Sequence, residues 1–465
     1  MFILNNNDPA PLYKQLYHQI RAQVLSGELP ADSRLPSVRD LATELSTSRN
    51  TVEGAYQELY AEGYIYSRPR SGYFVSALDH DAAPLPLPRA SRKEDRVEEA
   101  SPAYRYDFHP ARLDRQSFPA QLWRKLFVES LRNNSRQLVQ YGELQGEWNL
   151  RCAIRRYLER SRGVLCDQEQ IIVCAGLQQG LDLVALMLKE NHSALAAEDP
   201  GYHLPRAVFR NHGYEIVPVP VGANGLDLDL LIAGRSTIAY VTPSHQLPMG
   251  YVMPVANRLK LIEWAESGNT FIIEDDYDSE LRYHGKPIPS LQGLRPQGNI
   301  IYSGTFSKVL SPALRMSYLV LPRSLLPVYR RLFRDYFSTV PFLEQHTLAR
   351  FMEEGHWDRH IRRMRIIYKK KHDTLLRAVE RHFGPRATVI GQGAGLHVVL
   401  QLDGAGRCEA EIIRRAQDQG IRLLPFSDTC VSDASAGHTR LLLGFGGMTA
   451  GDIEPGIALL SQACF

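Results

Sequence analysis

The segment NIIYSGTFSKVLSPALR, residues 299–315, joins an apolar run to a group of hydroxyl and cationic side chains. Residues 300–302 predict a strand, and Lys308 follows shortly after its expected end. Thr305 and other hydroxyls precede this lysine, and Arg315 stands seven residues beyond it. Alone, Lys308 would more often be a solvated surface lysine. Together, these side chains could surround one bound phosphate.

A second apolar run, TFIIEDDY at residues 270–277, ends in acidic side chains. Ligands of open α/β sheets bind at the carboxyl ends of the strands, where these acids are expected to lie. Asp275 could pair with a protonated ring nitrogen, and the hydroxyl of Tyr277 could reach a phenolic oxygen. A divalent-metal cluster is the alternative use of the acids Glu274, Asp275, Asp276 and Asp278. We favour it less, because a carboxylate run after a strand has no defined ligand geometry.

Two further segments carry candidate cofactor contacts. The run IIVCAGLQQG at 171–180 predicts a strand followed by a helix, whose free amides near Gly176, Leu177 and Gln178 suit a phosphate. As an isolated glycine pattern this is a weak signal. Tyr202 follows another strand-like run and could stack on a flat ring, with packing in the core as the equal alternative.

Arg440 precedes the apolar run 441–445 and could hold a ligand carboxylate with its bidentate fork. It could as readily be a surface ion-pair partner.

These are the groups that pyridoxal 5′-phosphate (PLP) requires. That cofactor needs a lysine to form an imine, an acid to keep its pyridine nitrogen protonated, and cationic and hydroxyl groups for its phosphate. Lys308, Asp275 and Arg315 supply one group of each kind. Strand and helix patterns alternate through residues 105–465, so we predict an α/β domain there that binds this cofactor.

The chain divides once, at a proline-rich segment with mixed charge. We assign residues 79–104 to a linker, because its prolines favour an extended spacer and it shows no helix or strand period. Residues 1–78 read as three short helices and a β-hairpin, which are the parts of a winged helix-turn-helix. The first turn of the third helix presents Ser48, Arg49, Asn50 and Thr51, side chains able to reach base edges and phosphates.

Other polar residues of this unit support a DNA-binding interpretation. Arg39 lies on the second helix, and Arg68 and Arg70 lie on the wing beside Gly72, where the backbone can approach DNA closely. The unit has no net basic charge, so a small protein-binding domain is the alternative. The basic run 359–372 could be a second DNA surface, but the solvated face of a long helix is the favoured interpretation.

Composition excludes several classes of protein. The chain has 465 residues, 44% of them hydrophobic, and a formal net charge of +3, which argues against a disordered or polybasic protein. The six cysteines show no metal-ligand spacing, and no apolar run is long enough to span a bilayer. We expect a cytoplasmic protein.

Residues 11–75 resemble the DNA-binding domain of the GntR family of bacterial regulators, and residues from about 105 resemble a class I aminotransferase of fold type I. That fusion is typical of the MocR subfamily, whose members sense amino-acid-like or vitamin B6 ligands. The resemblance implies that operator DNA is contacted by Arg39, Arg49, Thr51 and Gly72. For the cofactor it implies the imine lysine Lys308, the pyridinium partner Asp275, the phenolic-oxygen contact Tyr277, the stacking Tyr202 and the phosphate ligands Thr305, Arg315, Gly176, Leu177 and Gln178. It also implies that Arg440 binds the ligand carboxylate and that Tyr141 reaches the phosphate of a neighbouring subunit, in a homodimer with shared sites.

One segment departs from the aminotransferase pattern. Those enzymes carry an N-P-T-G element whose asparagine supports the phenolic oxygen, whereas residues 242–250 read TPSHQLPMG. His245 or Gln246 could take over that contact. We expect a PLP-dependent regulator with at most weak transamination. A working aminotransferase tethered to DNA is the first alternative, and a cofactor-free dimerisation scaffold is the second.

Overall fold

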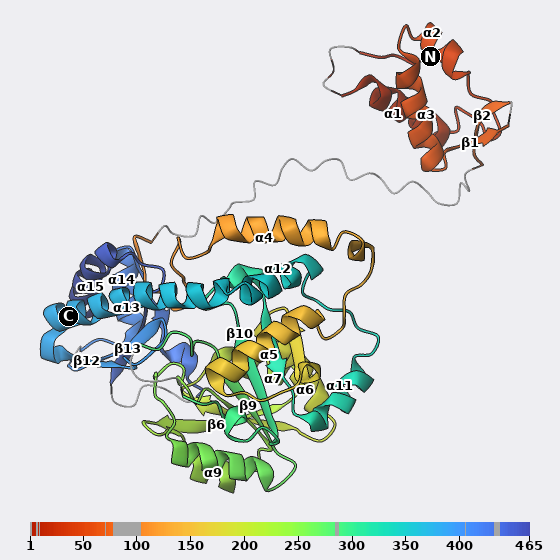
Figure 1. The fold of residues 1–465 in the computed structure, drawn as a ribbon. Helices are drawn as coiled ribbons and strands as arrows, with labels where there is room; N and C mark the ends of the chain where they lie inside the picture. Colours follow the sequence, from red (N-terminus) through yellow and green to blue (C-terminus); the bar gives the residue numbers. More distant parts are fainter. Residues whose placement is uncertain are drawn as a thin grey trace. The chain divides into compact units, whose positions relative to one another are not determined.

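The computed structural model describes residues 2–5, 8, 10–69, 71–77, 104–283, 288–404, 406–431 and 438–465. The chain divides into two compact units, residues 1–101 and residues 102–465, which we describe separately (Figure 1). Arg70 and all of the predicted linker except Tyr104 lie outside the described residues, so the linker assignment stays a prediction.

The N-terminal unit is a three-helix bundle with a β-hairpin. Its elements are α1 (Leu12–Leu25), α2 (Val38–Glu44), α3 (Arg49–Ala61), β1 (Ile65–Arg68) and β2 (Gly72–Val75). Leu16, Ile20, Val52 and Leu59 recur at helical spacing and are completely buried, so α1 and α3 pack through one apolar seam. The antiparallel hairpin β1–β2 forms the predicted wing.

Serine caps set the start of both helices of the helix-turn-helix. The side chain of Ser37 accepts a hydrogen bond from the backbone N–H of Asp40 at 3.1 Å and thereby caps α2. The side chain of Ser48 does the same for the N–H of Thr51 at 3.1 Å and caps α3. These bonds satisfy amides that the helices themselves leave free.

The large unit is built on an eight-stranded sheet with the order β4-β11-β10-β9-β8-β5-β6-β7. Its strands are β4 (Ile171–Cys174), β5 (Ala194–Asp199), β6 (Glu215–Gly222), β7 (Gly225–Leu226), β8 (Ile238–Val241), β9 (Phe271–Asp276), β10 (Ile300–Thr305) and β11 (Ser317–Val320). β6, β5, β8, β9 and β10 run parallel to one another, and β11 runs antiparallel to both of its neighbours. The carboxyl ends of the parallel strands therefore meet at one edge.

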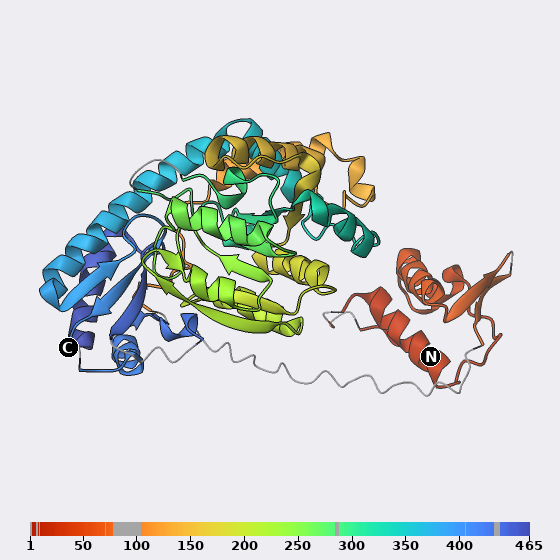
Figure 2. The same ribbon diagram turned by 90° about the horizontal axis from the view of Figure 1, so that it is seen from below.

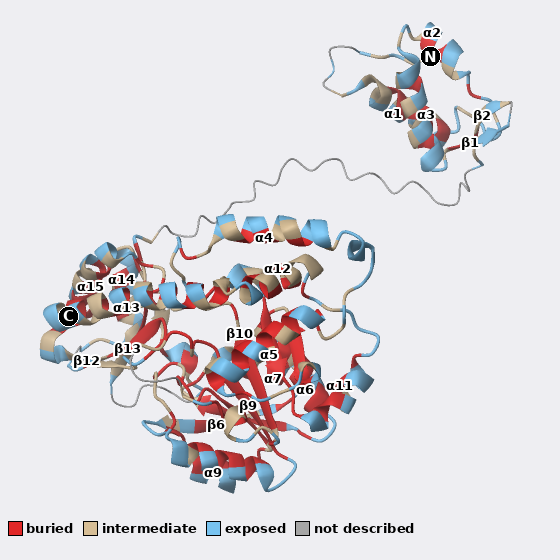
Figure 3. Ribbon diagram, in the orientation of Figure 1, coloured by how far each residue is buried: buried red, intermediate tan, exposed pale blue. Residues whose placement is uncertain are grey.

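Helices cover both faces of this sheet, which is why its central strands are continuous apolar runs. Ile273 of β9 packs in a core with α6 (Leu177–Leu188), α7 (His203–Asn211) and α11 (Leu326–Leu332). Its neighbour Ile272 packs on the opposite face with α8 (Leu228–Ala233) and α9 (Val255–Glu266). Figure 3 shows β9 and β10 as buried strands at the centre of the unit.

A second, antiparallel sheet of the order β12-β13-β16-β15 forms the C-terminal part of the large unit. Its strands are β12 (Ala387–Ile390), β13 (His397–Leu402), β15 (Leu424–Pro425) and β16 (Thr439–Gly444). The long helix α13 (His356–Phe383) lies beside this sheet (Figure 2). The parallel pair β3 (Tyr106–Asp107) and β14 (Ile421–Arg422) ties the start of the unit to this part.

The remaining helices surround these two sheets. They are α4 (Ala120–Asn133), α5 (Trp148–Arg162), α10 (Leu291–Leu294), α12 (Phe342–Glu353), α14 (Glu409–Asp418) and α15 (Ala450–Cys464). The basic run 359–372 lies in α13, where Ile361 and Met364 are buried and the Nζ of Lys371 forms an ion pair with Asp114 at 2.7 Å. This placement agrees with the helix interpretation of the run.

Candidate cofactor site

A cavity of about 290 Å³ opens at the edge where the carboxyl ends of the parallel strands meet. It is lined by His109, Pro110, Ala111, Leu177, Gln178, Tyr202, His203, Leu204, Thr242, Leu247, Asp275, Tyr277, Thr305, Ser307, Lys308, Pro312, Arg315, His397, Leu424, Thr429 and Leu442. Segments far apart in the sequence thus bring most of the predicted cofactor contacts into one space.

Lys308 follows the end of β10 and presents its amine to the cavity. Its Nζ lies 6.0 Å from the ring centroid of Tyr277, and within the described residues it has no ion pair. Burial lowers the pKa of this lysine, and the charges of Asp278 and Asp275 offset only part of that effect. A buried amine of lowered pKa is more often neutral and therefore more nucleophilic.

Asp275 lies on β9, which pairs with β10, the strand that precedes Lys308. Its Oδ2 accepts a hydrogen bond from the hydroxyl of Tyr240. Burial, together with the charges of Asp276, Asp278 and Glu198, raises the pKa of Asp275 to about 7. A protonated ring nitrogen placed beside this carboxyl would favour its charged form.

The neighbouring acids of the run have separate partners. Asp276 pairs with the Nε of Arg162 at 2.6 Å, and Glu274 accepts the backbone N–H groups of Leu291 and Gln292 at 2.8 and 3.0 Å. Over the described part of the chain, no group of three His, Cys, Asp or Glu residues could hold a metal ion. The geometry therefore gives the metal alternative no support.

Tyr277 is backed by a buried His–Asp pair. The Nδ1 of His245 lies 3.0 Å from the hydroxyl of Tyr277 and 2.8 Å from Oδ2 of Asp278. Burial, with the charges of Asp278 and Asp275, raises the pKa of Tyr277 well above its usual value, so its hydroxyl stays protonated. His245 itself does not line the cavity. Gln246 donates instead to the backbone oxygens of Pro200 and Leu247, at 2.9 and 2.7 Å.

The N-terminus of α6 forms a cradle for an anion. Gly176 caps this helix with a φ of +85°, and a Cβ at this position would lie 2.2 Å from Nη2 of Arg315. Only glycine allows so close an approach. Leu177 and Gln178 line the cavity in the first turn, where backbone N–H groups have no partner within the helix. Thr305 and Arg315 line the same space.

Tyr202 follows β5, lines the cavity and is half-buried. Burial raises its pKa to about 12. Its ring also packs against the core between the sheet and α6, so both alternatives for this residue are compatible with its position.

These residues suit PLP by their chemistry. An amine, a buried carboxyl and a guanidinium face one cavity, and within the described residues neither Lys308 nor Arg315 has an ion-pair partner. Helix amides and the hydroxyls of Thr305 and Ser307 add the neutral donors that a phosphate needs. PLP bound here would supply a reactive carbonyl carbon and an aromatic ring able to withdraw electrons.

Two predicted contacts lie outside this cavity. Tyr141 is 81% exposed, and its ring stacks on that of Phe337 with centroids 4.2 Å apart. Arg440, on β16, donates from Nε to Oε1 of Gln401 at 3.3 Å, and its guanidinium lies 5.6 Å from the ring centroid of Phe426. Neither residue lines the cavity.

Several lining residues were not predicted from the sequence. Ser307 could have been found, because it is the hydroxyl residue directly before Lys308. His109 and His397 come from segments that carry no motif and reach the cavity only through the fold. Leu442 lies two residues beyond Arg440 on the same strand, and we return to it below.

The predicted DNA contacts lie on the surface of the N-terminal unit. Arg39 on α2 and Arg49 on α3 are exposed, and Gly72 begins β2 with a φ of +98°. The hydroxyl of Thr51 lies 2.8 Å from that of its cap, Ser48. The wing residue Arg68 pairs with Asp32 at 3.2 Å.

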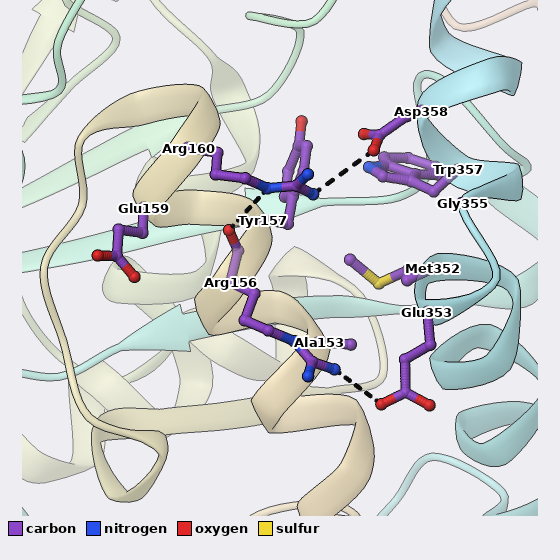
Figure 4. A pocket seen from close by; sticks show the side chains of 10 residues that line it. All are labelled: Ala153, Arg156, Tyr157, Glu159, Arg160, Met352, Glu353, Gly355, Trp357 and Asp358. Carbon is purple, nitrogen blue, oxygen red and sulfur yellow. Dashed lines mark hydrogen bonds and ion pairs between the residues drawn. The ribbon is translucent and has the colours of Figure 1, made fainter.

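A second hollow, of about 640 Å³, lies between α5 and the helices α12 and α13 (Figure 4). Its arginines already have acidic partners. Arg156 pairs with Glu353 at 2.8 Å, and Arg160 pairs with Asp358 at 3.5 Å. None of the predicted cofactor contacts lines this hollow.

A winged helix-turn-helix on one chain with an aminotransferase-like domain defines a class of DNA-binding regulator. Residues 12–75 match the family described as bacterial regulatory proteins, gntR family, and residues 111–458 match aminotransferase class I and II. The chain belongs to the MocR subfamily of GntR-family regulators and is a transcriptional regulator of that type. This membership implies DNA binding.

Individual relatives share both parts. The chain is 40% identical over 461 residues to the uncharacterised HTH-type transcriptional regulator YdeL of Bacillus subtilis, covering 99% of this chain and 98% of that protein. It is 35% identical over 475 residues to the probable rhizopine catabolism regulatory protein MocR of Rhizobium meliloti, covering 100% and 96%. The crystal structure of the multiple substrate aminotransferase from Thermococcus profundus superposes with a TM-score of 0.70 at 26% identity, covering 78% of this chain and 92% of that one.

The predicted fold class, a winged helix-turn-helix plus a fold type I domain, is therefore confirmed. Over the described residues, no helix is both long and apolar enough to cross a bilayer.

Proposed function

We propose that this regulator binds PLP through Lys308 and senses an amino acid, an amine or a B6 vitamer in the cavity beside it. The observation that carries the proposal is the joint presence of Lys308, Asp275 and Arg315 around one cavity. A scaffold that served only for dimerisation would have no use for this set. The presence of these three side chains around one cavity favours cofactor binding over the cofactor-free alternative.

Each residue of the site has a distinct role in this proposal. Lys308 attaches the cofactor, and Asp275 holds the proton of the ring nitrogen. Tyr277, positioned by His245, donates its hydroxyl proton to the phenolic oxygen, and Tyr202 stacks on the ring. The phosphate is held by Thr305, Arg315 and the helix terminus at Gly176, Leu177 and Gln178.

An amine ligand would take the place of Lys308 on the carbonyl carbon of the cofactor. PLP bound here would supply the carbon to which either amine could bond, and Nζ of Lys308 would take up the protons that the ligand amine gives up. Burial lowers the pKa of Lys308, so the released amine is more often neutral and can return to the carbon. The exchange is therefore reversible, as a sensor requires.

The proposal includes operator DNA as partner, contacted by Arg39, Arg49, Thr51 and Gly72 on the exposed surface of the N-terminal unit. It also includes a homodimer in which Tyr141 reaches the phosphate of the second subunit. The exposure of this tyrosine leaves it free to do so. A protein that acts on chromosomal DNA in a bacterium works in the cytoplasm.

The proposal is tested with the full-length protein and a labelled operator fragment. We expect an absorption band of bound cofactor that is absent in Lys308→Ala, and a ligand that shifts both this band and the affinity for DNA. A ligand can change DNA binding only if its affinity differs between two conformations. A wild-type protein that takes up PLP but whose DNA affinity is the same with every ligand would refute the sensing role.

An active aminotransferase is the second candidate, favoured by the complete lysine, acid and arginine set and by the 26% identity to a solved aminotransferase. It predicts multiple turnover of an amino donor with an oxo-acid acceptor. A single turnover that stops at the aminated cofactor would support the regulator instead.

A further inference from the structure

Much of the cavity lining that the proposed function does not assign to the cofactor is apolar. This apolar wall consists of Pro110, Ala111, Leu204, Leu247, Leu424 and Leu442. None of these side chains can pair with a charged group on a ligand. The chemistry of this wall therefore bears on which amino compounds the site accepts.

Strand register explains why an arginine is missing from this wall. Leu442 of β16 pairs with Leu424 of β15, and both line the cavity. Arg440 lies one pleat further along, opposite Gln401 of β13, where it donates to the side chain of Gln401. Side chains two residues apart on a strand share a face but stand about 7 Å apart. Phe426, which is buried, packs against both Leu442 and the guanidinium of Arg440.

Several polar groups of the lining already have hydrogen-bond partners within the protein. The hydroxyl of Thr242 donates to Glu198 at 2.6 Å, and that of Thr429 donates to the backbone oxygen of Phe426 at 2.6 Å. The Nε2 of His397 lies 3.1 Å from the backbone oxygen of Pro248, and the Nδ1 of His109 accepts from the backbone N–H of Ala111 at 3.1 Å.

These two histidines are also uncharged near neutral pH. Burial is the main cause that lowers the pKa of His397 to about 3, and it is also the main cause that lowers the pKa of His109 below its ordinary value. Arg315 is thus the permanently charged side chain among the described residues that line the cavity, and the proposed function assigns it, together with Lys308, to the cofactor.

We propose that the cavity recognises a small primary amine with an apolar body and rejects the amino acid that carries the same side chain. This inference rests on the proposed function, because the amine must react at the cofactor. A carboxylate placed against the leucine wall would lose its hydration without gaining a cationic partner. The volume of about 290 Å³ is at the lower end for ligand cavities, which favours a small ligand once a cofactor shares the space.

Matched pairs of ligands test this inference. The full-length protein loaded with PLP is titrated with isoamylamine against leucine and with phenethylamine against phenylalanine, two pairs whose members differ only by the carboxylate. Binding is measured by the absorption band and independently by calorimetry. We expect the amine to bind at least about tenfold more tightly in at least one pair, because an unpaired buried carboxylate forfeits a charge-assisted hydrogen bond.

The possible outcomes separate the two proposals. Equal or tighter binding of the amino acids, with the cofactor bound, would overturn the inference and leave the proposed function standing. Loss of amino-acid binding in Arg440→Gln would assign the carboxylate to that arginine and would also overturn it. A protein that binds no PLP, or whose band no amino compound changes, would refute the proposed function, and the inference would fall with it.

An introduced arginine gives a test by gain of binding. Leu442→Arg is expected to narrow or reverse the preference by supplying the missing cation, whereas Leu442→Met keeps an apolar side chain and is expected to keep the preference. Because Leu442 is buried, its arginine variant could fail to fold. Leu424→Arg then tests the same expectation, since Leu424 is the half-buried partner of Leu442 on β15. An unchanged preference in a folded arginine variant would overturn the assignment of this leucine pair to the ligand site.

Discussion

Asp275 and Asp276 are adjacent on β9, but among the described residues only Asp276 has a cationic partner. Asp276 forms a buried ion pair with Arg162 at 2.6 Å and accepts a hydrogen bond from the hydroxyl of Tyr302 at 2.5 Å. Asp275 has the hydroxyl of Tyr240 as its hydrogen-bond donor and, within the described residues, no ion-pair partner. The buried ion pair needs no ligand, whereas the carboxyl of Asp275 would gain from a cation brought by one.

The raised pKa of Asp275 predicts how the stability of the cofactor-free protein changes with pH. Because its pKa rises from 3.8 to about 7 on folding, its favourable contribution is complete below about pH 4 and is lost as the pH rises through 7. Asp275→Asn removes this dependence. We expect wild type to lose on the order of a few kcal/mol relative to the variant between pH 4 and pH 8. Urea unfolding followed by fluorescence measures it.

Tryptophan fluorescence reports the unfolding of the large unit specifically, because all four tryptophans lie within residues 102–465. Asp276→Asn is the matched control. It leaves the buried Arg162 without its partner and is expected to cost about 3–5 kcal/mol at neutral pH. A difference between wild type and Asp275→Asn that does not vary with pH would mean that Asp275 is already ionised without a cofactor. Asp275→Asn is also expected to bind PLP at least about tenfold more weakly than wild type.

At the scale of elements, much of the fold could be predicted from local pattern. Apolar runs that end in acids or hydroxyls predicted β9 and β10, and the shared direction of such strands predicted that Asp275 and Thr305 would meet at one edge. The position of Arg440 could not be predicted in this way. Its two-residue alternation with Leu442 places both on one face, but the register of β16 against β13 and β15 decides which one reaches the cavity. The pairing register of a strand depends on strands that are distant in the sequence, so it cannot be predicted from the segment alone.

The first turn of α6 depends on a glycine at its cap. We expect Gly176→Ala to destabilise the large unit by about 1–3 kcal/mol, because the φ of +85° strains an alanine and its Cβ would lie against Arg315. It should also weaken PLP binding by displacing this arginine. Chemical unfolding and a cofactor titration measure the two effects. Gly180→Ala, in the same helix but with no contact closer than 3.4 Å, should change stability by less than about 1 kcal/mol, and an equal loss in both would contradict this role.

At the start of α3, one residue is expected to stabilise the helix and its neighbour to contact DNA. Arg49 is exposed and should matter to DNA alone, so Arg49→Ala is expected to weaken operator binding about tenfold with little change in the unfolding midpoint. Ser48→Ala removes the helix cap and should cost about 1 kcal/mol of stability. Fluorescence anisotropy with labelled operator and thermal unfolding of residues 1–78 within the full chain measure these effects.

Lys14→Ala is the charge-matched control for Arg49→Ala, since Lys14 is an exposed cation on α1 outside the predicted DNA contacts. An equal loss of affinity in both variants would mean that binding follows net charge instead of contact by α3.

At the scale of the whole molecule, the assembly of two chains is the step that would unite ligand sensing with two DNA-binding units. The ring of Tyr141 stacks on that of Phe337, and both side chains are mostly exposed. Large exposed apolar side chains in contact with each other are typical of a surface that another protein covers. Burial of this pair by a second subunit would also bring Tyr141 towards the phosphate of its partner, as the family resemblance implies.

This arrangement makes Phe337 a test of dimerisation that leaves the cavity intact. Because its side chain is 59% exposed, Phe337→Asp should fold normally, while a charge placed in a subunit interface should weaken association by at least about tenfold. Sedimentation velocity over a range of protein concentrations measures the association. Ile232→Asp, at a site 53% exposed on α8, introduces the same charge elsewhere and is expected to leave association unchanged. If the two variants associate equally well, the second subunit does not cover Phe337. If Phe337→Asp is monomeric and also loses PLP affinity while Ile232→Asp keeps it, the cofactor site depends on the partner, and ligand exchange in one subunit can then influence the other.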